Sequence, residues 1–268
     1  MRVALHRRHR SSGPNLGPYM EKKTVPQILV PTAGLGSWKA RLADPEKHWK
    51  RGASAYEAAV SWELASQTAR GLPTAVADVL DQDEDLRGAE LLFALPEHKV
   101  PLPGGSRASQ NDIWALLRGP RGLISMAVEA KADEAFGDTL ESWKRDASPG
   151  KDERLRHLYQ VLKCETDLPP GTRYQLVHRT ASALIEADRI GAEYAIMMVQ
   201  SFRKSSPSIS DYVAFGNYFN VALSANTITR LTQHTKPKLY LAWAISTVCS
   251  DQDVSSLRAE SDPSKTDM

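Results

Sequence analysis

Residues 122–137 read GLISMAVEAKADEAFG, an apolar run that ends in a carboxylate and an ammonium two positions apart. Successive side chains on a strand point to opposite faces of a sheet. A strand here therefore directs Glu129 and Lys131 to the same face. That face would also hold Ser125, Ala127 and Asp133, and the opposite face would hold Ile124, Met126, Val128, Ala130 and Ala132. Because the other positions are small or apolar, the segment is predicted to be buried, and buried charges need partners.

A second strand is predicted upstream, in QNDIWALL at residues 110–117, and the turn signal RGPRG joins the two strands. Strands joined by a short turn pair antiparallel, so the start of the first lies beside the end of the second. Asp112 precedes Glu129 by 17 positions and Lys131 by 19, so the hairpin is expected to bring the three side chains together. Carboxylates held close together are ligands that Mg²⁺ or Mn²⁺ takes.

The segments NDIWALL and VEAKADE resemble the PD-(D/E)XK nuclease superfamily, whose pattern is an Asp, a hairpin turn and Glu-x-Lys on the next strand. With the helices and the strand around them, the resemblance covers about residues 54–203. It implies an α/β fold with a central mixed β-sheet flanked by helices and a restriction-endonuclease-like αβββαβ core. The chain departs from the pattern at Asn111, which stands in place of the proline before the Asp, and no recognition module is identified.

The resemblance also implies a chemistry for these residues. Asp112 and Glu129 would be metal ligands, with the backbone carbonyl of Ala130 as a further ligand, and Lys131 would be the positive catalytic group. A bound Mg²⁺ or Mn²⁺ can orient a water and polarise the scissile phosphate. The lysine can stabilise the attacking hydroxide or the charge on phosphorus.

The segment ASAYEAAVSWELASQTARG predicts a helix that begins near Ser54 and stops at Gly71. Glu57 shares a helix face with Val60 and Leu64, so its side chain is expected to point inward. In many members of the superfamily a glutamate on the first helix completes the metal shell, which makes Glu57 a candidate catalytic residue and metal ligand. Glu63 is the competing choice from the same helix.

A later helix, RYQLVHRTASALIEADRIG, carries a polar stripe opposite an apolar one. The stripe comprises Gln175, Arg179, Ser182 and Glu186. The superfamily often sets such a helix across the site, so Gln175 could reach the metal-bound water and Arg179 could bind a phosphate bidentately. The alternative is a solvated helix face.

Basic residues near the hairpin are candidates for nucleic-acid binding, as a track for phosphates. They are Arg107, Arg118, Arg121, Lys144 and Arg145. The alternative is that these side chains belong to solvated turns.

The bulk composition is that of a globular protein, with 268 residues, 41% hydrophobic and 25% charged, and a formal net charge of +2. Residues 1–25 are predicted to be a disordered basic arm, 26–250 the nuclease-like domain, and 251–268 a disordered tail. The basic arm could bind nucleic acid, and the alternatives are a solvated tail or a true start codon at Met20. Cys164 and Cys249 have no companions at metal spacing, and no apolar run reaches membrane length, so we expect a cytoplasmic protein with no membrane partner.

The sequence thus predicts a metal-dependent phosphodiesterase, a nuclease of endonucleolytic type that acts on DNA with Mg²⁺ or Mn²⁺. The alternative is a non-catalytic nucleic-acid- or protein-binding module that retains the fold, in which Glu129 and Lys131 form a buried structural ion pair. The two readings differ in whether the hairpin edge binds metal. A homodimer would let such a core cut both strands of a duplex, although nothing in the sequence marks an interface.

Overall fold

The structure is a computed structural model that describes residues 32, 34–204 and 206–260. The basic arm predicted for residues 1–25 and the last part of the predicted tail, 261–268, lie outside the described residues. The described helices are α1 (Leu35–Lys39), α2 (Pro45–His48), α3 (Ser54–Ser66), α4 (Thr74–Leu80), α5 (Leu140–Lys144), α6 (Pro149–Leu162), α7 (Tyr174–Ile190), α8 (Ile209–Tyr218) and α9 (Asp251–Glu260). The described strands are β1 (Glu90–Val100), β2 (Ser109–Gly119), β3 (Gly122–Lys131), β4 (Tyr194–Ser201), β5 (Thr227–Thr235) and β6 (Lys238–Ile245).

The six strands form one mixed sheet in the order β1-β2-β3-β4-β6-β5. The pairs β1–β2, β2–β3 and β5–β6 are antiparallel, whereas β3–β4 and β4–β6 are parallel. Parallel strands need a crossover connection, and helices α5, α6 and α7 connect β3 to β4. The α/β class and the mixed sheet flanked by helices, as predicted, are confirmed.

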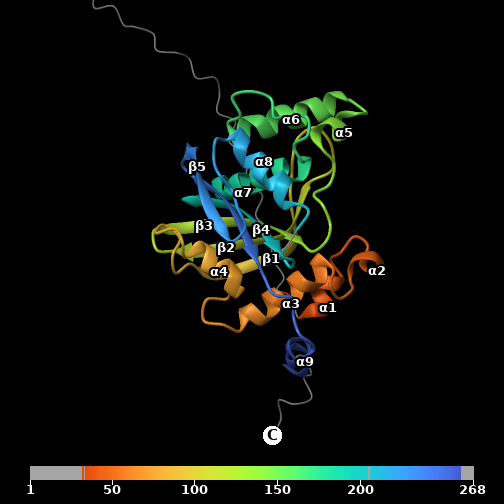
Figure 1. Cartoon of the computed structure of the whole chain (residues 1–268), viewed down its shortest axis with the longest axis vertical. Coiled ribbons are helices and arrows are strands. Elements are labelled where there is room, and N and C mark those ends of the chain that lie inside the picture. Colours follow the sequence, from red (N-terminus) through yellow and green to blue (C-terminus); the bar gives the residue numbers. More distant parts are fainter. Residues whose placement is uncertain (1–31, 33, 205, 261–268) are drawn as a thin grey trace, which may run out of the picture. The chain divides into compact units, whose positions relative to one another are not determined.

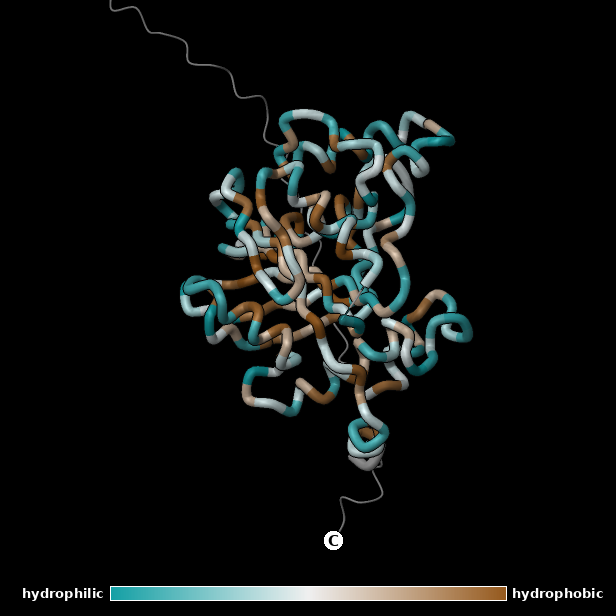
Figure 2. The backbone as a smooth tube through the Cα atoms, in the orientation of Figure 1, coloured by the Kyte–Doolittle hydropathy of each residue, from teal (hydrophilic) through white to brown (hydrophobic). Residues whose placement is uncertain are grey.

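Helices cover both faces of the sheet, with α3 and α4 on one face and α5 to α8 on the other (Figure 1). Ile124, Met126 and Val128 pack in the core on the α3 and α4 side, and Ala127 packs in the core on the other side. The predicted alternation of β3 is therefore confirmed. Figure 2 shows the hydrophobic colour concentrated on the central strands and the hydrophilic colour on the surrounding loops.

The β2–β3 turn is short because Gly122 takes a backbone φ of 146°, which side chains rarely adopt. A Cβ at this position would collide with the carboxylate of Glu193. That carboxylate in turn accepts a hydrogen bond of 3.0 Å from Leu123 N. The turn therefore fixes the register of the hairpin and, with it, the position of the residues at its other end.

The structure differs from the sequence-based expectations at the C-terminus. Residues 251–260 form helix α9, where a disordered tail is predicted from residue 251. Ser250 and Asp253 cap this helix reciprocally, since Ser250 N donates to Asp253 Oδ2 at 2.7 Å and Asp253 N donates to Ser250 Oγ at 3.2 Å. Val254 packs against Val60 and Cys249. The cap and this apolar contact explain why a polar segment is ordered. Among the described residues, no helix is long and apolar enough to cross a membrane.

Candidate functional site

The hairpin brings Asp112 beside the end of β3, as its spacing predicts. The regular ladder between β2 and β3 extends as far as the pair Ile113 and Val128, which places Asp112 opposite Glu129. Beyond this pair, the hydrogen-bond acceptor for Ala130 N is the Asp112 side chain in place of a β2 backbone carbonyl. The Asp112 Oδ2 accepts this hydrogen bond at 2.7 Å. Asp112 is thus held at the point where the two strands stop pairing.

Glu129 is buried, 2% exposed, and both of its oxygens have cationic or amide partners. Its Oε1 lies 2.9 Å from Lys131 Nζ and accepts a hydrogen bond of 2.6 Å from Gln175 Nε2. Its Oε2 accepts a hydrogen bond of 2.6 Å from Arg179 Nε. Glu129 therefore lies between two cations and is satisfied by residues from β3 and α7.

Lys131 is also buried, 4% exposed, and its ammonium group has a defined position. Besides Glu129, its Nζ donates to Gln175 Oε1 at 3.1 Å and lies 5.0 Å from the centre of the Phe136 ring. Gln175 thus accepts from Lys131 and donates to Glu129, so one amide orients both groups. The structure thus places Gln175 in contact with Lys131 and Glu129, and its catalytic role stays a prediction.

In the polar stripe of α7, Arg179, Ser182 and Glu186 are buried and Gln175 is half-buried, so the alternative of a solvated helix face is wrong. Arg179 Nη1 donates to Ser109 Oγ at 3.2 Å, and Ser182 Oγ donates to the same oxygen at 2.7 Å. Glu186 lies one turn further and pairs with His98 and Arg189. In this structure Arg179 binds Glu129 and is 6% exposed, where the sequence predicts a side chain that contacts phosphate.

A third carboxylate, Glu97, joins the site and was missed by sequence reasoning. In β1 the residues beside it, Pro96 and His98, pair with Ile113 and Asn111 of β2, so Glu97 lies opposite Asp112. Its side chain accepts a hydrogen bond from Gln110. Glu97, Asp112 and Glu129 therefore follow one another across three adjacent strands. Only the register of β1 on β2 would have located Glu97 at the site, and the spacing of the β2–β3 hairpin does not give that register.

The pKa values of these acids reflect burial and mutual repulsion. Burial and the negative charge of Glu129 raise the pKa of Asp112 well above its usual value. Burial also raises the pKa of Glu97, against the hydrogen bond from Gln110. Burial acts to raise the pKa of Glu129 too, but the charges of Lys131 and Arg179 outweigh it and the pKa is lowered. The site thus holds one carboxyl group whose pKa is lowered and two whose pKa is raised.

The acids and Lys131 line one cavity of about 460 Å³. The strands contribute Glu97, Gln110, Asp112, Glu129, Ala130 and Lys131. The remaining lining residues are Glu134 and eight residues from Leu42 to Ala55, which precede or begin α3. This opening gives a ligand access to the otherwise buried end of the hairpin.

Glu57 and Glu63 are not brought into this group. Glu57 is buried, as predicted, but its Oε1 accepts from Gly52 N at 2.8 Å and its Oε2 accepts from Cys249 N at 3.1 Å. Glu63 accepts a hydrogen bond from Trp38 Nε1. Neither glutamate is among the described residues that line the cavity. The inward direction of Glu57 is explained by backbone amides at the start of α3 and near the C-terminus.

The predicted track of basic residues does not form one surface beside Asp112. Arg118 and Arg121 lie at the turn end of the hairpin, where Arg118 pairs with Glu90 and Arg121 pairs with Asp85. At about 3.3 Å per residue, the strand places Arg118 roughly 20 Å from Asp112. Arg107 is exposed in the β1–β2 loop and is not among the described lining residues of the cavity.

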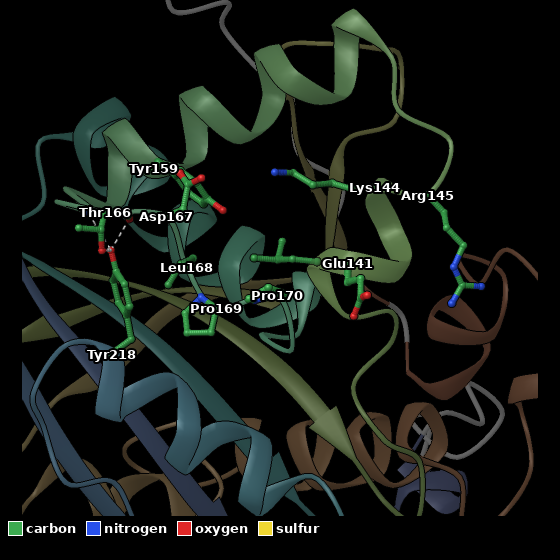
Figure 3. Close-up of a pocket in the computed structure, with 11 residues that line it drawn as sticks. Glu141, Lys144, Arg145, Tyr159, Thr166, Asp167, Leu168, Pro169, Pro170 and Tyr218 are labelled. Carbon is green, nitrogen blue, oxygen red and sulfur yellow. Dashed lines mark hydrogen bonds between the residues drawn. The ribbon is translucent and has the colours of Figure 1, made fainter.

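Lys144 and Arg145 lie at a second cavity, of about 680 Å³, formed by α5, the end of α6, residues 166–170 and α8. In Figure 3 the Lys144 side chain extends toward Tyr159 and Asp167, whereas Arg145 points away from them. Among the described residues, none lines both this cavity and the one beside Asp112.

The chain belongs to the family described as a domain of unknown function, DUF6946, which matches residues 31–248. No curated protein and no solved structure matches the chain. The family match covers the whole sheet, the cavity beside Asp112 and helix α7.

The donors at the cavity have the chemistry that Mg²⁺ or Mn²⁺ requires, namely carboxylate and carbonyl oxygens. Burial and the negative charge of Glu129 raise the pKa of Asp112, and the charge of a bound cation would offset this rise. Within the described residues, no three or more His, Cys, Asp or Glu side chains are already arranged around one metal position. Glu129 would have to exchange one of its present partners for the ion.

Proposed function

We propose that this protein is a metal-dependent nuclease that acts on DNA as an endonuclease, with a restriction-endonuclease-like core. The observation that carries the proposal is the row of Glu97, Asp112 and Glu129 on adjacent strands, with Lys131 beside them at one cavity. The succession α3, β1, β2, β3, α7 and β4 supports the αβββαβ core. Buried acids and a buried lysine in a cleft are typical of functional sites.

In this proposal Asp112, Glu129 and the carbonyl of Ala130 hold Mg²⁺ or Mn²⁺. The bound ion would polarise the scissile phosphate and lower the pKa of a water. Lys131 stabilises negative charge on the attacking oxygen or on phosphorus, because its ammonium is desolvated and pre-positioned. Gln175 keeps Lys131 and Glu129 in place through the two hydrogen bonds of its amide. Arg179 holds Glu129 from the α7 side.

The test is nicking of supercoiled plasmid with Mn²⁺, with Mg²⁺ and with a chelator. Wild type is compared with Lys131→Ala and Asp112→Asn, and Lys236→Ala on the exposed β5–β6 turn serves as a control. We expect metal-dependent nicking that both site substitutions reduce by a factor of at least about 100, since removal of one charge-stabilising group costs about 10²–10³ in rate. Nicking that persists in both site variants would point to a contaminant and would contradict the proposal.

The second candidate is a non-catalytic binding module. It is favoured by the full set of partners around Glu129, since Lys131, Gln175 and Arg179 already satisfy both oxygens. This reading predicts no binding of Mn²⁺ in calorimetry. The nuclease reading predicts binding that Asp112→Asn weakens strongly.

A further inference from the structure

The cavity beside Asp112 has a basic edge that is separate from its acidic strands. The edge is the segment Asp44–Lys50, with the sequence DPEKHWK, and is called the basic segment below. Lys47, His48 and Lys50 of this segment line the cavity together with Asp112 and Glu129. All three of these basic side chains are exposed.

The basic segment has a defined local structure. Asp44 caps α2, accepting a hydrogen bond of 3.2 Å from Lys47 N, and Pro45 occupies the first turn, where its missing N–H costs nothing. Trp49 is half-buried and makes an edge contact with Tyr56 of α3, with ring centres 5.2 Å apart. The cap and this aromatic contact attach the segment to the domain, so its lysines are held at the cavity.

The lysines of the basic segment are not used in ion pairs within the described part of the chain. The basic residues next to this segment do have ionic partners. Arg51 pairs with Asp251 and donates to Cys249 O, and Lys39 pairs with Glu46. A structural role therefore accounts for Arg51 and leaves Lys47 and Lys50 without one. Both lysines line a cavity whose strands carry three carboxylates.

We infer that the basic segment binds the phosphates of the DNA strand that flank the phosphate entering the cavity. This inference rests on the proposed function and adds where the substrate is held. A polyanion that approaches three carboxylates is repelled unless cations lie beside them. Lys47 and Lys50 supply cations at the same opening, and exposed lysines bind phosphates through release of counterions. The arginines at the turn end of the hairpin do not meet this requirement, since they lie far from Asp112 and are paired.

The test measures binding of a fluorescein-labelled 20-nucleotide single-stranded DNA by anisotropy, in a chelator, over a series of salt concentrations. The variant Lys47→Glu with Lys50→Glu is compared with Arg230→Glu with Lys236→Glu. The second pair has the same change in net charge, on exposed residues of β5 and the turn after it, toward the other end of the sheet. Both variants are checked for an unchanged Tm.

We expect the substitution in the basic segment to weaken binding at least tenfold. It should lower the slope of log K against log salt by about 1.4, because each phosphate contact with a single strand contributes about 0.7. The control pair should bind within about threefold of wild type. Equal weakening in both pairs would show a nonspecific effect of net charge and would overturn the inference.

The result separates this inference from the proposed function. If wild type nicks plasmid and the Lys47 and Lys50 variant binds DNA as wild type does, the inference is wrong and the nuclease proposal stands. If wild type neither nicks plasmid nor binds DNA, both are wrong. The variant Lys47→Arg with Lys50→Arg should bind DNA as wild type does. That result would support a phosphate contact, since arginine keeps the charge at each position.

Discussion

At the scale of single residues, the charged carboxylate of Asp112 lowers the free energy of unfolding. Its raised pKa means that the folded state disfavours the charged carboxylate relative to the unfolded chain. A group with a raised pKa contributes stability that is complete below its unfolded pKa and is lost as pH rises through its folded pKa. The contribution of this one group to the free energy of unfolding should therefore fall as pH rises from the usual pKa of aspartate through the raised pKa of Asp112.

Asp112→Asn should stabilise the protein at neutral pH while it abolishes the proposed activity. We expect a gain of about 1 kcal/mol in the free energy of unfolding at pH 8, a size usual for removal of a strained functional group. The gain should shrink as the pH is lowered toward the usual pKa of aspartate. Urea unfolding at several pH values measures it. Asp133→Asn is the control, since Asp133 is exposed and pairs with Arg203 at the surface. Equal stability of Asp112→Asn and wild type at every pH would contradict the assignment.

Arg179 is the residue whose loss should harm folding most. Arg179→Met removes the partner of Glu129 Oε2 and leaves a buried carboxylate with less compensation. Breaking a buried pair in this way costs about 3–5 kcal/mol, and the remaining Lys131 contact favours the lower end. Arg118→Met breaks an exposed pair with Glu90 and should cost about 1 kcal/mol or less. Similar losses in the two variants, measured by urea unfolding, would show that Glu129 does not depend on Arg179.

At the scale of elements, the junction between α3 and the C-terminal segment depends on Glu57. Its two oxygens accept from Gly52 N and Cys249 N, which lie far apart in the chain. Glu57→Gln removes the charge and places an amide donor against one backbone N–H, so we expect a loss of about 1–3 kcal/mol. Glu153→Gln on the exposed face of α6 should change stability by less than about 0.5 kcal/mol.

The same variant tests the metal-ligand role that the sequence suggests for Glu57. Because its oxygens are used by backbone amides, we expect Mn²⁺ affinity in calorimetry to stay within about twofold of wild type at a temperature where the variant is fully folded. A large loss of affinity would restore Glu57 to the metal shell. The position of Glu57 on an inward helix face was predictable, whereas its hydrogen-bond partners come from a turn and a distant segment that periodicity does not locate.

Helices and strands could be predicted where the sequence shows a clear hydrophobic periodicity and a marked turn. Strand β3 was found because its side chains alternate and its turn is marked by glycines, and the hairpin then placed Asp112 correctly. Strand β5 was missed because TITRLTQHT is an edge strand in which only Leu231 and His234 are buried, so it has no apolar run. Glu97 was missed for a different reason, since its place beside Asp112 depends on the pairing of β1 with β2.

At the scale of the whole molecule, the site draws its residues from elements that are distant in the chain. The carboxylates come from three strands, Gln175 and Arg179 from α7, and the cavity edge from residues 42–55. Only the β2–β3 part lies within one hairpin, and only that part could be predicted from spacing. A ligand that binds at such a site connects all of these elements, so its binding should be visible in global stability.

Mn²⁺ should therefore raise the Tm of wild type and not that of Asp112→Asn. A ligand at 100 times its dissociation constant adds about 2.7 kcal/mol to the free energy of unfolding, which corresponds to a rise of roughly 5–10 °C for a chain of this size. The rise should be larger at pH 8 than at pH 5.5, because the raised pKa of Asp112 makes metal and proton compete for the same carboxylate. Scanning calorimetry with and without chelator measures both effects. A rise of equal size in Asp112→Asn would place the ion elsewhere, and no rise in wild type would favour the binding module, in which Lys131 and Arg179 are the permanent partners of Glu129.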